Sequence, residues 1–447
     1  MTIRLALFVA LLAFSTPAAY PLAPPTHRKD TATAAALTSR GFTSGEKGDI
    51  AAARKDFDEA IRLAPTLGRA YLGRGIIRAM SGEWEKAIPD LDEAIRLGPA
   101  DPLAYYNRGL ARLKTDNLDQ AINDFDGTIR LSPKHGAAFA NRAEAWATKR
   151  EWRKAIGDFD QALGLTDADV RPYLLNARGA VLAAAGEREK ALKDYTEAIR
   201  LDPKSAVGFI NRGNLRGAGG EWEEAIRDFT EAVRVDPAST CALANRGVAW
   251  RELKEWDKAL ADFDKALKID PQLVRALYSR AWVRSAKQEW DKALADYNEI
   301  IRLDPKIEDV RLTRGMILRM RGEWKGALAD FDEIVRLNPK SAGALSERAI
   351  FRAGCPDAKY FDAKKAVEDA TEACKLSNGK NPDHLRVLGL AVAATGDFAE
   401  AIKWERKALE DADYAKREGE TAKIYIREYE AKRPIRGHAA PPATKKP

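Results

Sequence analysis

DFDEAIRLAP at residues 56–65 and DLDEAIRLGP at residues 90–99 are two copies of one segment, placed 34 residues apart. Related segments recur along the chain and end at Pro133, Pro203, Pro237, Pro271, Pro305 and Pro339. A fixed period of this length predicts a solenoid, in which each unit buries its apolar face only against its neighbours. No single unit can enclose a site, so the function of such a chain is expected to lie on its surface.

Counting back from Pro65 places the start of the first block at Ala34 and divides the chain into eleven blocks. The blocks are residues 34–67, 68–101, 102–135, 136–169, 172–205, 206–239, 240–273, 274–307, 308–341, 342–381 and 382–415. Each holds two helical stretches, because side chains of one kind recur at spacings of three and four. In the seventh block, for example, Ala259, Phe263 and Ala266 stand at slots 20, 24 and 27.

A large side chain at slot 4, a small one at slot 8, alanine at slots 20 and 27, an aromatic at slot 24 and proline at slot 32 resemble the tetratricopeptide repeat. The resemblance covers residues 34–415. It implies an all-α fold, an α-solenoid of stacked antiparallel helix pairs forming a right-handed superhelix. Residues 416–433 are expected to form a helix that caps the open end of the stack.

The first residues have the layout of a secretory signal peptide, with Arg4 ahead of an apolar run and small residues at Ala18 and Ala19. We therefore expect a signal peptide at 1–19, a linker at 20–33 and a protein that is periplasmic or secreted. A retained membrane anchor is the alternative. No later segment is apolar for long enough to cross a membrane, and residues 434–447 read as a disordered basic tail.

The net charge of +7 comes from the two ends, and the repeats between them carry equal numbers of basic and acidic residues. Phosphate binding needs a concentrated basic face, so nucleic acid is not expected as the ligand. Metal-ligand clusters, phosphate-binding loops and nucleophile motifs are absent from the sequence. We therefore expect no enzyme, no cofactor and no metal, and we interpret the three cysteines as free thiols.

Slots 7 and 23 change together along the chain. Arginine occupies slot 7 in ten blocks, at Arg40, Arg74, Arg108, Arg142, Arg178, Arg212, Arg246, Arg280, Arg314 and Arg348. Aspartate occupies slot 23 in the same ten, at Asp56, Asp90, Asp124, Asp158, Asp194, Asp228, Asp262, Asp296, Asp330 and Asp369. The eleventh block has Leu388 and Trp404 instead. This joint presence and loss predicts an ion pair, within a block or with the next; a basic ladder for an acidic ligand is the alternative.

The resemblance places slot 6 and its neighbours in the concave groove, where asparagine recurs at Asn107, Asn141, Asn176, Asn211, Asn214 and Asn245. An amide both donates and accepts hydrogen bonds, so such a row could hold an extended peptide by its backbone. The row resembles the asparagine ladder of the superhelical arm of protein O-linked sugar transferases. Amides bonded to their own groove wall are the alternative. The same groove is expected to carry the aromatic anchors Tyr106, Tyr173, Tyr278 and Trp282.

Taken together, these patterns predict an exported scaffold that binds an extended segment of another protein in the concave groove. The alternative is a non-catalytic adaptor subunit of a cell-wall or polysaccharide enzyme complex, with a glycan as its ligand.

Overall fold

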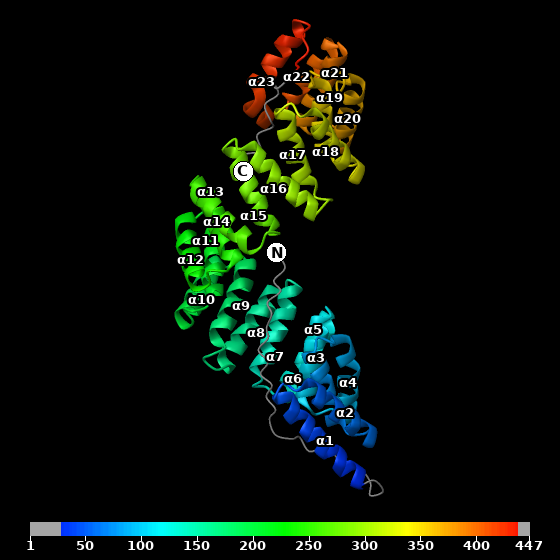
Figure 1. Cartoon of the computed structure of the whole chain (residues 1–447), viewed down its shortest axis with the longest axis vertical. Coiled ribbons are helices and arrows are strands. Elements are labelled where there is room, and N and C mark those ends of the chain that lie inside the picture. The colour runs from blue at the N-terminus through cyan, green and yellow to red at the C-terminus, as the bar shows by residue number, and fades with distance from the viewer. Residues whose placement is uncertain (1–27, 437–447) are drawn as a thin grey trace. The chain divides into compact units, whose positions relative to one another are not determined.

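The computed structural model describes residues 28–436, and every regular element in that range is an α-helix (Figure 1). The helices are α1 (Arg28–Glu46), α2 (Ile50–Leu63), α3 (Gly68–Met80), α4 (Trp84–Leu97), α5 (Pro102–Lys114), α6 (Leu118–Leu131), α7 (Gly136–Thr148), α8 (Trp152–Leu165), α9 (Arg171–Ala184), α10 (Arg188–Leu201), α11 (Ala206–Ala218), α12 (Trp222–Val235), α13 (Thr240–Glu252), α14 (Trp256–Ile269), α15 (Val274–Ala286), α16 (Trp290–Leu303), α17 (Glu308–Met320), α18 (Trp324–Leu337), α19 (Ala342–Gly354), α20 (Ala363–Leu376), α21 (Pro382–Thr395), α22 (Phe398–Ala408) and α23 (Ala412–Glu430). The all-α solenoid of paired helices expected from the sequence is confirmed.

The helices divide into two compact units, one ending at Ala242 and the other beginning at Leu243. In each unit, the two helices of a block pack against each other, and the second helix packs against the first helix of the next block. First helices of neighbouring blocks also contact each other, as α3 contacts α5 and α19 contacts α21. The first helices thus lie side by side in one layer. We refer to the outer surface of that layer as the first-helix face of its unit.

In ten of the eleven blocks, the turn between the two helices contains one residue with a positive φ angle, at slot 15. Glycine adopts this left-handed conformation without steric cost, and it does so at Gly48, Gly82, Gly186, Gly220, Gly322 and Gly396. Asp116, Arg150, Lys254 and Gln288 adopt the same conformation in other blocks, with φ of 61° or 62°. Because the turn recurs in glycine and non-glycine blocks alike, helix packing holds it in place.

Glycine at slot 8 allows the two helices of a block to approach closely. A Cβ atom at Gly109 would lie 2.8 Å from the ring of Phe125, and one at Gly213 would lie 2.8 Å from the ring of Phe229. These phenylalanines occupy slot 24 and are buried. The small residue at slot 8 and the aromatic ring at slot 24 therefore form one contact, which recurs from block to block.

The predicted arginine–aspartate pair is present in all ten blocks. Each slot-7 arginine contacts the slot-23 aspartate of its own block at 2.5–2.7 Å. The aspartates are buried, and most of the bonds use two nitrogens of the guanidinium group, as at Arg178, where Nε and Nη2 both donate to Asp194. Such paired bonds fix the geometry of the helix pair.

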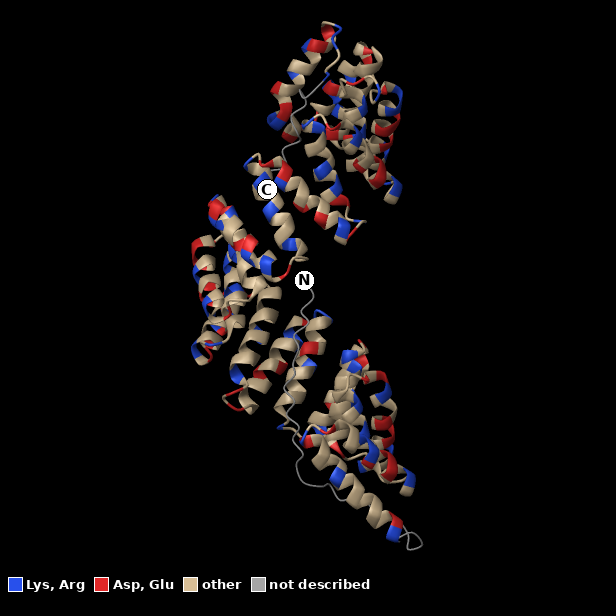
Figure 2. Cartoon of the chain, viewed as in Figure 1, with Lys and Arg blue, Asp and Glu red and all other residues tan. Residues whose placement is uncertain are grey.

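The arginines also connect neighbouring blocks, which the sequence analysis did not predict. The remaining Nη1 of Arg178 donates to Asp160, at slot 25 of the preceding block, at 2.6 Å. Equivalent contacts join Arg74 to Asp58, Arg108 to Asp92, Arg142 to Asp126, Arg280 to Asp264 and Arg348 to Asp332. Figure 2 shows basic and acidic residues interspersed on the helices. With carboxylates on both sides, these arginines serve the stack and are not left over for an acidic ligand.

Both ends of the array differ from the boundaries expected from the sequence. Helix α1 begins at Arg28, so the end of the expected linker at 20–33 is helical, because residues 28–33 contain no glycine or proline. The expected cap at 416–433 is helix α23, which begins earlier, at Ala412. The Asp411 side chain caps this helix by accepting a hydrogen bond from the Tyr414 N–H at 2.8 Å.

The expected signal peptide at 1–19 lies outside the described residues. Between residues 28 and 436, no helix has the length and apolar character needed to span a membrane.

The eleventh block, which lacks the arginine–aspartate pair, has a different polar group in its interior. Glu405 occupies slot 24, lies against Gly389 and is fully buried, and neither of its carboxylate oxygens has a hydrogen-bond partner. Arg386, on α21, is the opposite charge that acts on it. Burial raises the pKa of Glu405 to about 8, while Arg386 acts in the opposite direction. This block therefore lacks both the arginine–aspartate pair and the slot-24 aromatic ring, and it has the titratable carboxyl of Glu405 in their place.

Candidate functional site

Tyr106 and Asn141 lie on neighbouring first helices, α5 and α7, and contact each other. The Asn141 Nδ2 donates to the Tyr106 hydroxyl at 3.0 Å and to the Ala137 carbonyl at 2.9 Å. Both residues are buried, and the Tyr106 ring packs on His135 with ring centres 4.6 Å apart. Burial raises the pKa of Tyr106 to about 12. The Asn141 amide nitrogen therefore donates to groups of the protein itself, as the alternative to peptide binding expects.

The other predicted asparagines differ from one another in their surroundings. Asn107 and Asn176 each donate from Nδ2 to a carbonyl four residues earlier on their own helix, at 2.8 and 3.0 Å. Asn107 is partly exposed, whereas Asn176 is 7% exposed and its Oδ1 has no hydrogen-bond partner. Asn211 and Asn214 are partly exposed on α11. Asn245 is buried on α13 and belongs to the second unit.

Tyr173 lies on the first helix α9, close to a carboxylate that the repeat pattern does not single out. Its ring packs against a hydrophobic cluster that includes Ala140 and Ala143 of α7. Glu144, one residue beyond Ala143, raises the pKa of the Tyr173 hydroxyl, although burial contributes more. The sequence did hold a signal, because Glu144 is the only acidic residue at slot 9 in the eleven blocks.

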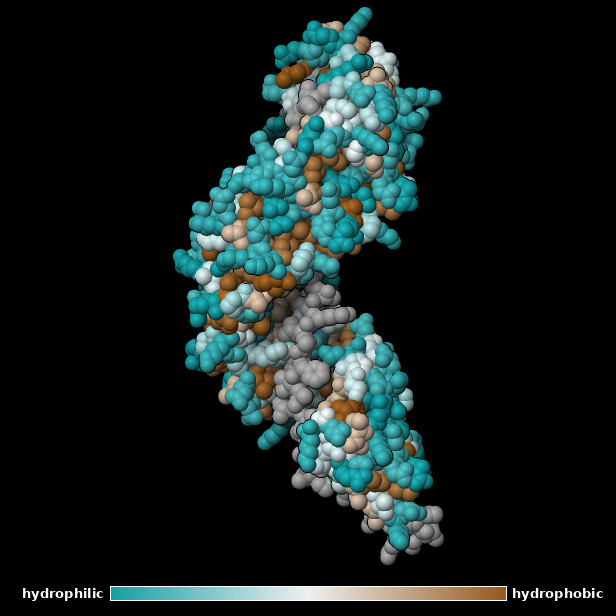
Figure 3. Space-filling model, in the orientation of Figure 1, coloured by the Kyte–Doolittle hydropathy of each residue, from teal (hydrophilic) through white to brown (hydrophobic). Residues whose placement is uncertain are grey.

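In the second unit, Tyr278 and Trp282 lie one helical turn apart on α15, and each is 37% exposed. All ten tryptophans fall within the described residues, and Trp282 is the only one that is exposed. The guanidinium of Arg251, on α13, lies over the Trp282 ring at 5.2 Å from its centre, a geometry that favours cation–π attraction. On the face visible in Figure 3, hydrophobic residues form separate patches in a mostly hydrophilic surface.

Comparison with family models matches most of the repeat region. A tetratricopeptide repeat model matches residues 106–170, 210–274, 278–342 and 358–416, and three related repeat models match residues 34–67, 77–116 and 172–205. The chain belongs to the tetratricopeptide repeat family. Proteins of this family are generally non-catalytic scaffolds. No curated protein matches the chain.

Solved structures of other tetratricopeptide proteins resemble this one at low sequence identity. The C-terminal part of a repeat protein from Cytophaga hutchinsonii is 18% identical, with a TM-score of 0.46, and the match covers 54% of this chain and 98% of that one. YrrB, described as having an unusual peptide-binding site, is 24% identical, with a TM-score of 0.35 and coverage of 42% and 97%. Yeast Tom70 is 17% identical, with a TM-score of 0.36 and coverage of 89% and 95%. These likenesses concern the fold alone.

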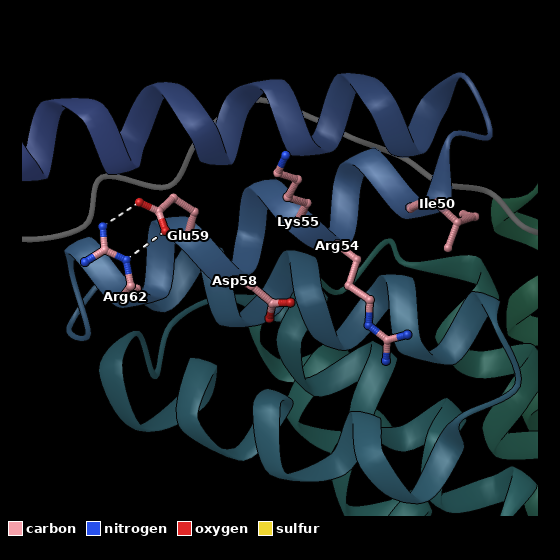
Figure 4. A pocket seen from close by; sticks show the side chains of 7 residues that line it. Ile50, Arg54, Lys55, Asp58, Glu59 and Arg62 are labelled. Atoms are coloured by element: carbon pink, nitrogen blue, oxygen red, sulfur yellow. Dashed lines mark hydrogen bonds and ion pairs between the residues drawn. The ribbon is translucent and has the colours of Figure 1, made fainter.

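Two hollows involve the second helices α2 and α20. One is a shallow depression on α2, where Arg62 pairs with Glu59 and Arg54 pairs with Glu83 (Figure 4). The other lies beside Trp404 and Cys374, where burial raises the thiol pKa to about 11 and so disfavours the reactive thiolate. Within the described part of the chain, no three His, Cys, Asp or Glu side chains are grouped as metal ligands would be.

Proposed function

We propose that this protein is a scaffold that binds an extended segment of a partner protein along its first-helix faces. The family supports the general class, since tetratricopeptide repeats form protein-interaction scaffolds. The exposed pair Tyr278 and Trp282 on α15 is the observation that favours the first-helix face as the binding surface. Large aromatic side chains dominate the binding energy of many interfaces, and every other tryptophan of the chain is at least partly buried in the packing of the helices.

The asparagines contribute in two ways in this proposal. Asn107 and Asn211 are partly exposed on α5 and α11, so their amides can donate to or accept from the backbone of a bound segment. Asn141 is instead committed to Tyr106 and Ala137, and it holds the tyrosine in place. Backbone hydrogen bonds of this kind bind a segment without selecting its sequence, so selectivity is left to the aromatic and charged side chains.

We further propose that the protein is exported and works outside the cytoplasmic membrane. The basic start, apolar run and small residues of positions 1–19 support this proposal. Cleavage after the small residues would place the partner in the periplasm or outside the cell.

Replacing Tyr278 and Trp282 together with alanine should reduce partner capture from an envelope extract of the native host by more than about tenfold, because loss of a central aromatic anchor often has an effect of this size. The measurement is label-free mass spectrometry of proteins retained by the immobilised full-length chain. Ile424→Ala is the matched control, since this exposed residue lies on α23. An unchanged set of retained proteins in the aromatic variant would remove the first-helix face of the second unit as the binding surface.

A further inference from the structure

Three polar atoms at the first-helix face of the first unit are buried without a hydrogen-bond partner. They are the Glu144 Oε2 on α7, and the Tyr173 hydroxyl and the Asn176 Oδ1 on α9. Buried polar atoms are nearly always paired in folded proteins, and an unpaired one costs free energy comparable to a lost hydrogen bond. Tyr173 packs against α7 beside Glu144, and the two groups act on each other, so their unpaired oxygens indicate one site whose partner comes from outside the chain.

The chemistry of these atoms defines that partner as a donor. A carboxylate oxygen and an amide oxygen only accept hydrogen bonds, and a phenol hydroxyl can accept as well as donate. A partly buried carboxylate also needs a positive charge to offset its lost hydration. Lys114 of α5 acts on Glu144 through space, but among the described residues no ion pair joins the two. The carboxylate therefore has room for a cation supplied by a ligand.

We infer that Glu144 and Tyr173 accept one basic side chain of the bound segment, a lysine ammonium or an arginine guanidinium. This inference rests on the proposed function and adds a charge preference to it. The Asn176 Oδ1 belongs to a different contact, because a Cβ atom on Gly208 of α11 would lie 3.6 Å from it.

The electrostatics of the site agree with a cationic ligand. Burial raises the pKa of Glu144 to about 7, and Lys114 only partly opposes that effect. A cation placed beside the carboxylate would favour its ionised form, so binding and ionisation of Glu144 would support each other. The slot-7 arginines nearby, Arg142 and Arg178, are not the cations that neutralise Glu144, because each already contacts aspartates of the stack.

The test is retention of degenerate peptide pools on the immobilised full-length protein. The pools have acetylated N-termini and differ only in one fixed central residue, which is lysine, arginine, norleucine or glutamate. Pools with lysine or arginine should be retained about tenfold more than the norleucine pool, as expected for one charge-assisted hydrogen bond. Glu144→Gln should remove that preference, and Tyr173→Phe should reduce it.

Glu189→Gln, an exposed change on α10, is the matched control and should keep the preference. Thermal melts of each variant show whether the fold is intact. Retention of all pools without a preference for lysine or arginine would overturn this inference and leave the proposed function standing. A preference that persists in a folded Glu144→Gln variant would also overturn it. Retention of no pool would count against both.

Discussion

Replacing Asp194 with leucine should destabilise the protein by about 3 kcal/mol, the lower end of the range for removing one partner of a buried ion pair. The Asp194 side chain is 8% exposed and receives two hydrogen bonds from Arg178. Without it, the Arg178 guanidinium stays partly buried with only Asp160 as a partner. The measurement is urea unfolding followed by circular dichroism, with the change in unfolding free energy as the result.

A double-mutant cycle separates the ion pair from the side chains themselves. Arg178→Leu combined with Asp194→Leu should lower the unfolding free energy by less than the sum of the two single changes, because the double variant leaves no unpaired buried charge. Asp160→Leu is the control, since its side chain is 51% exposed and exposed ion pairs contribute about 0–1 kcal/mol. Strict additivity of the two buried positions would show that their contact does not contribute to stability.

Raising the pH should destabilise the C-terminal helices, because Glu405 has a pKa of about 8 in the folded protein and an ordinary value of 4.5. Between these two values, the folded state holds a proton that the unfolded state has lost, so stability falls as pH rises through that window and levels off above it. The loss should amount to a few kcal/mol, since one pKa unit corresponds to about 1.4 kcal/mol.

Glu405→Gln should remove most of this pH dependence, because the amide does not titrate. Comparing the urea midpoints of the two proteins at about pH 5.5 and about pH 8.5 measures the difference. Glu420→Gln, on the exposed side of α23, should leave the wild-type slope unchanged. Equal slopes in the wild type and in Glu405→Gln would mean that the buried carboxyl does not control the stability of this end of the chain.

Much of the fold was predictable because the same pattern of side-chain sizes and charges recurs in the blocks of the repeat. The contact of a slot-8 glycine with a slot-24 ring, as in Gly213 and Phe229, follows from residue size alone. The pairing of slots 7 and 23 followed from their joint loss at Leu388 and Trp404. The second bond from Arg178 to Asp160 was not foreseen, because aspartate also recurs on exposed helix surfaces and its spacing alone did not distinguish the two.

The candidate site was less predictable, because it depends on departures from the repeat. The slot pattern placed Asn141 in the groove but did not indicate that its amide would bind the Tyr106 hydroxyl. It also gave no special weight to Glu144, whose importance comes from its burial and from the unpaired oxygen beside Tyr173. Helix α23 was placed too late because the capping role of Asp411 was not recognised.

Site-specific photo-crosslinking in the native host tests most directly whether the first-helix face is the binding surface. A photoreactive phenylalanine analogue would replace Tyr278, on α15, or Lys265, an exposed residue on the second helix α14. We expect the analogue at position 278 to crosslink to a partner protein through one extended segment, and the analogue at position 265 to give no such product. Crosslinks to the partner from position 265 and none from position 278 would contradict the account.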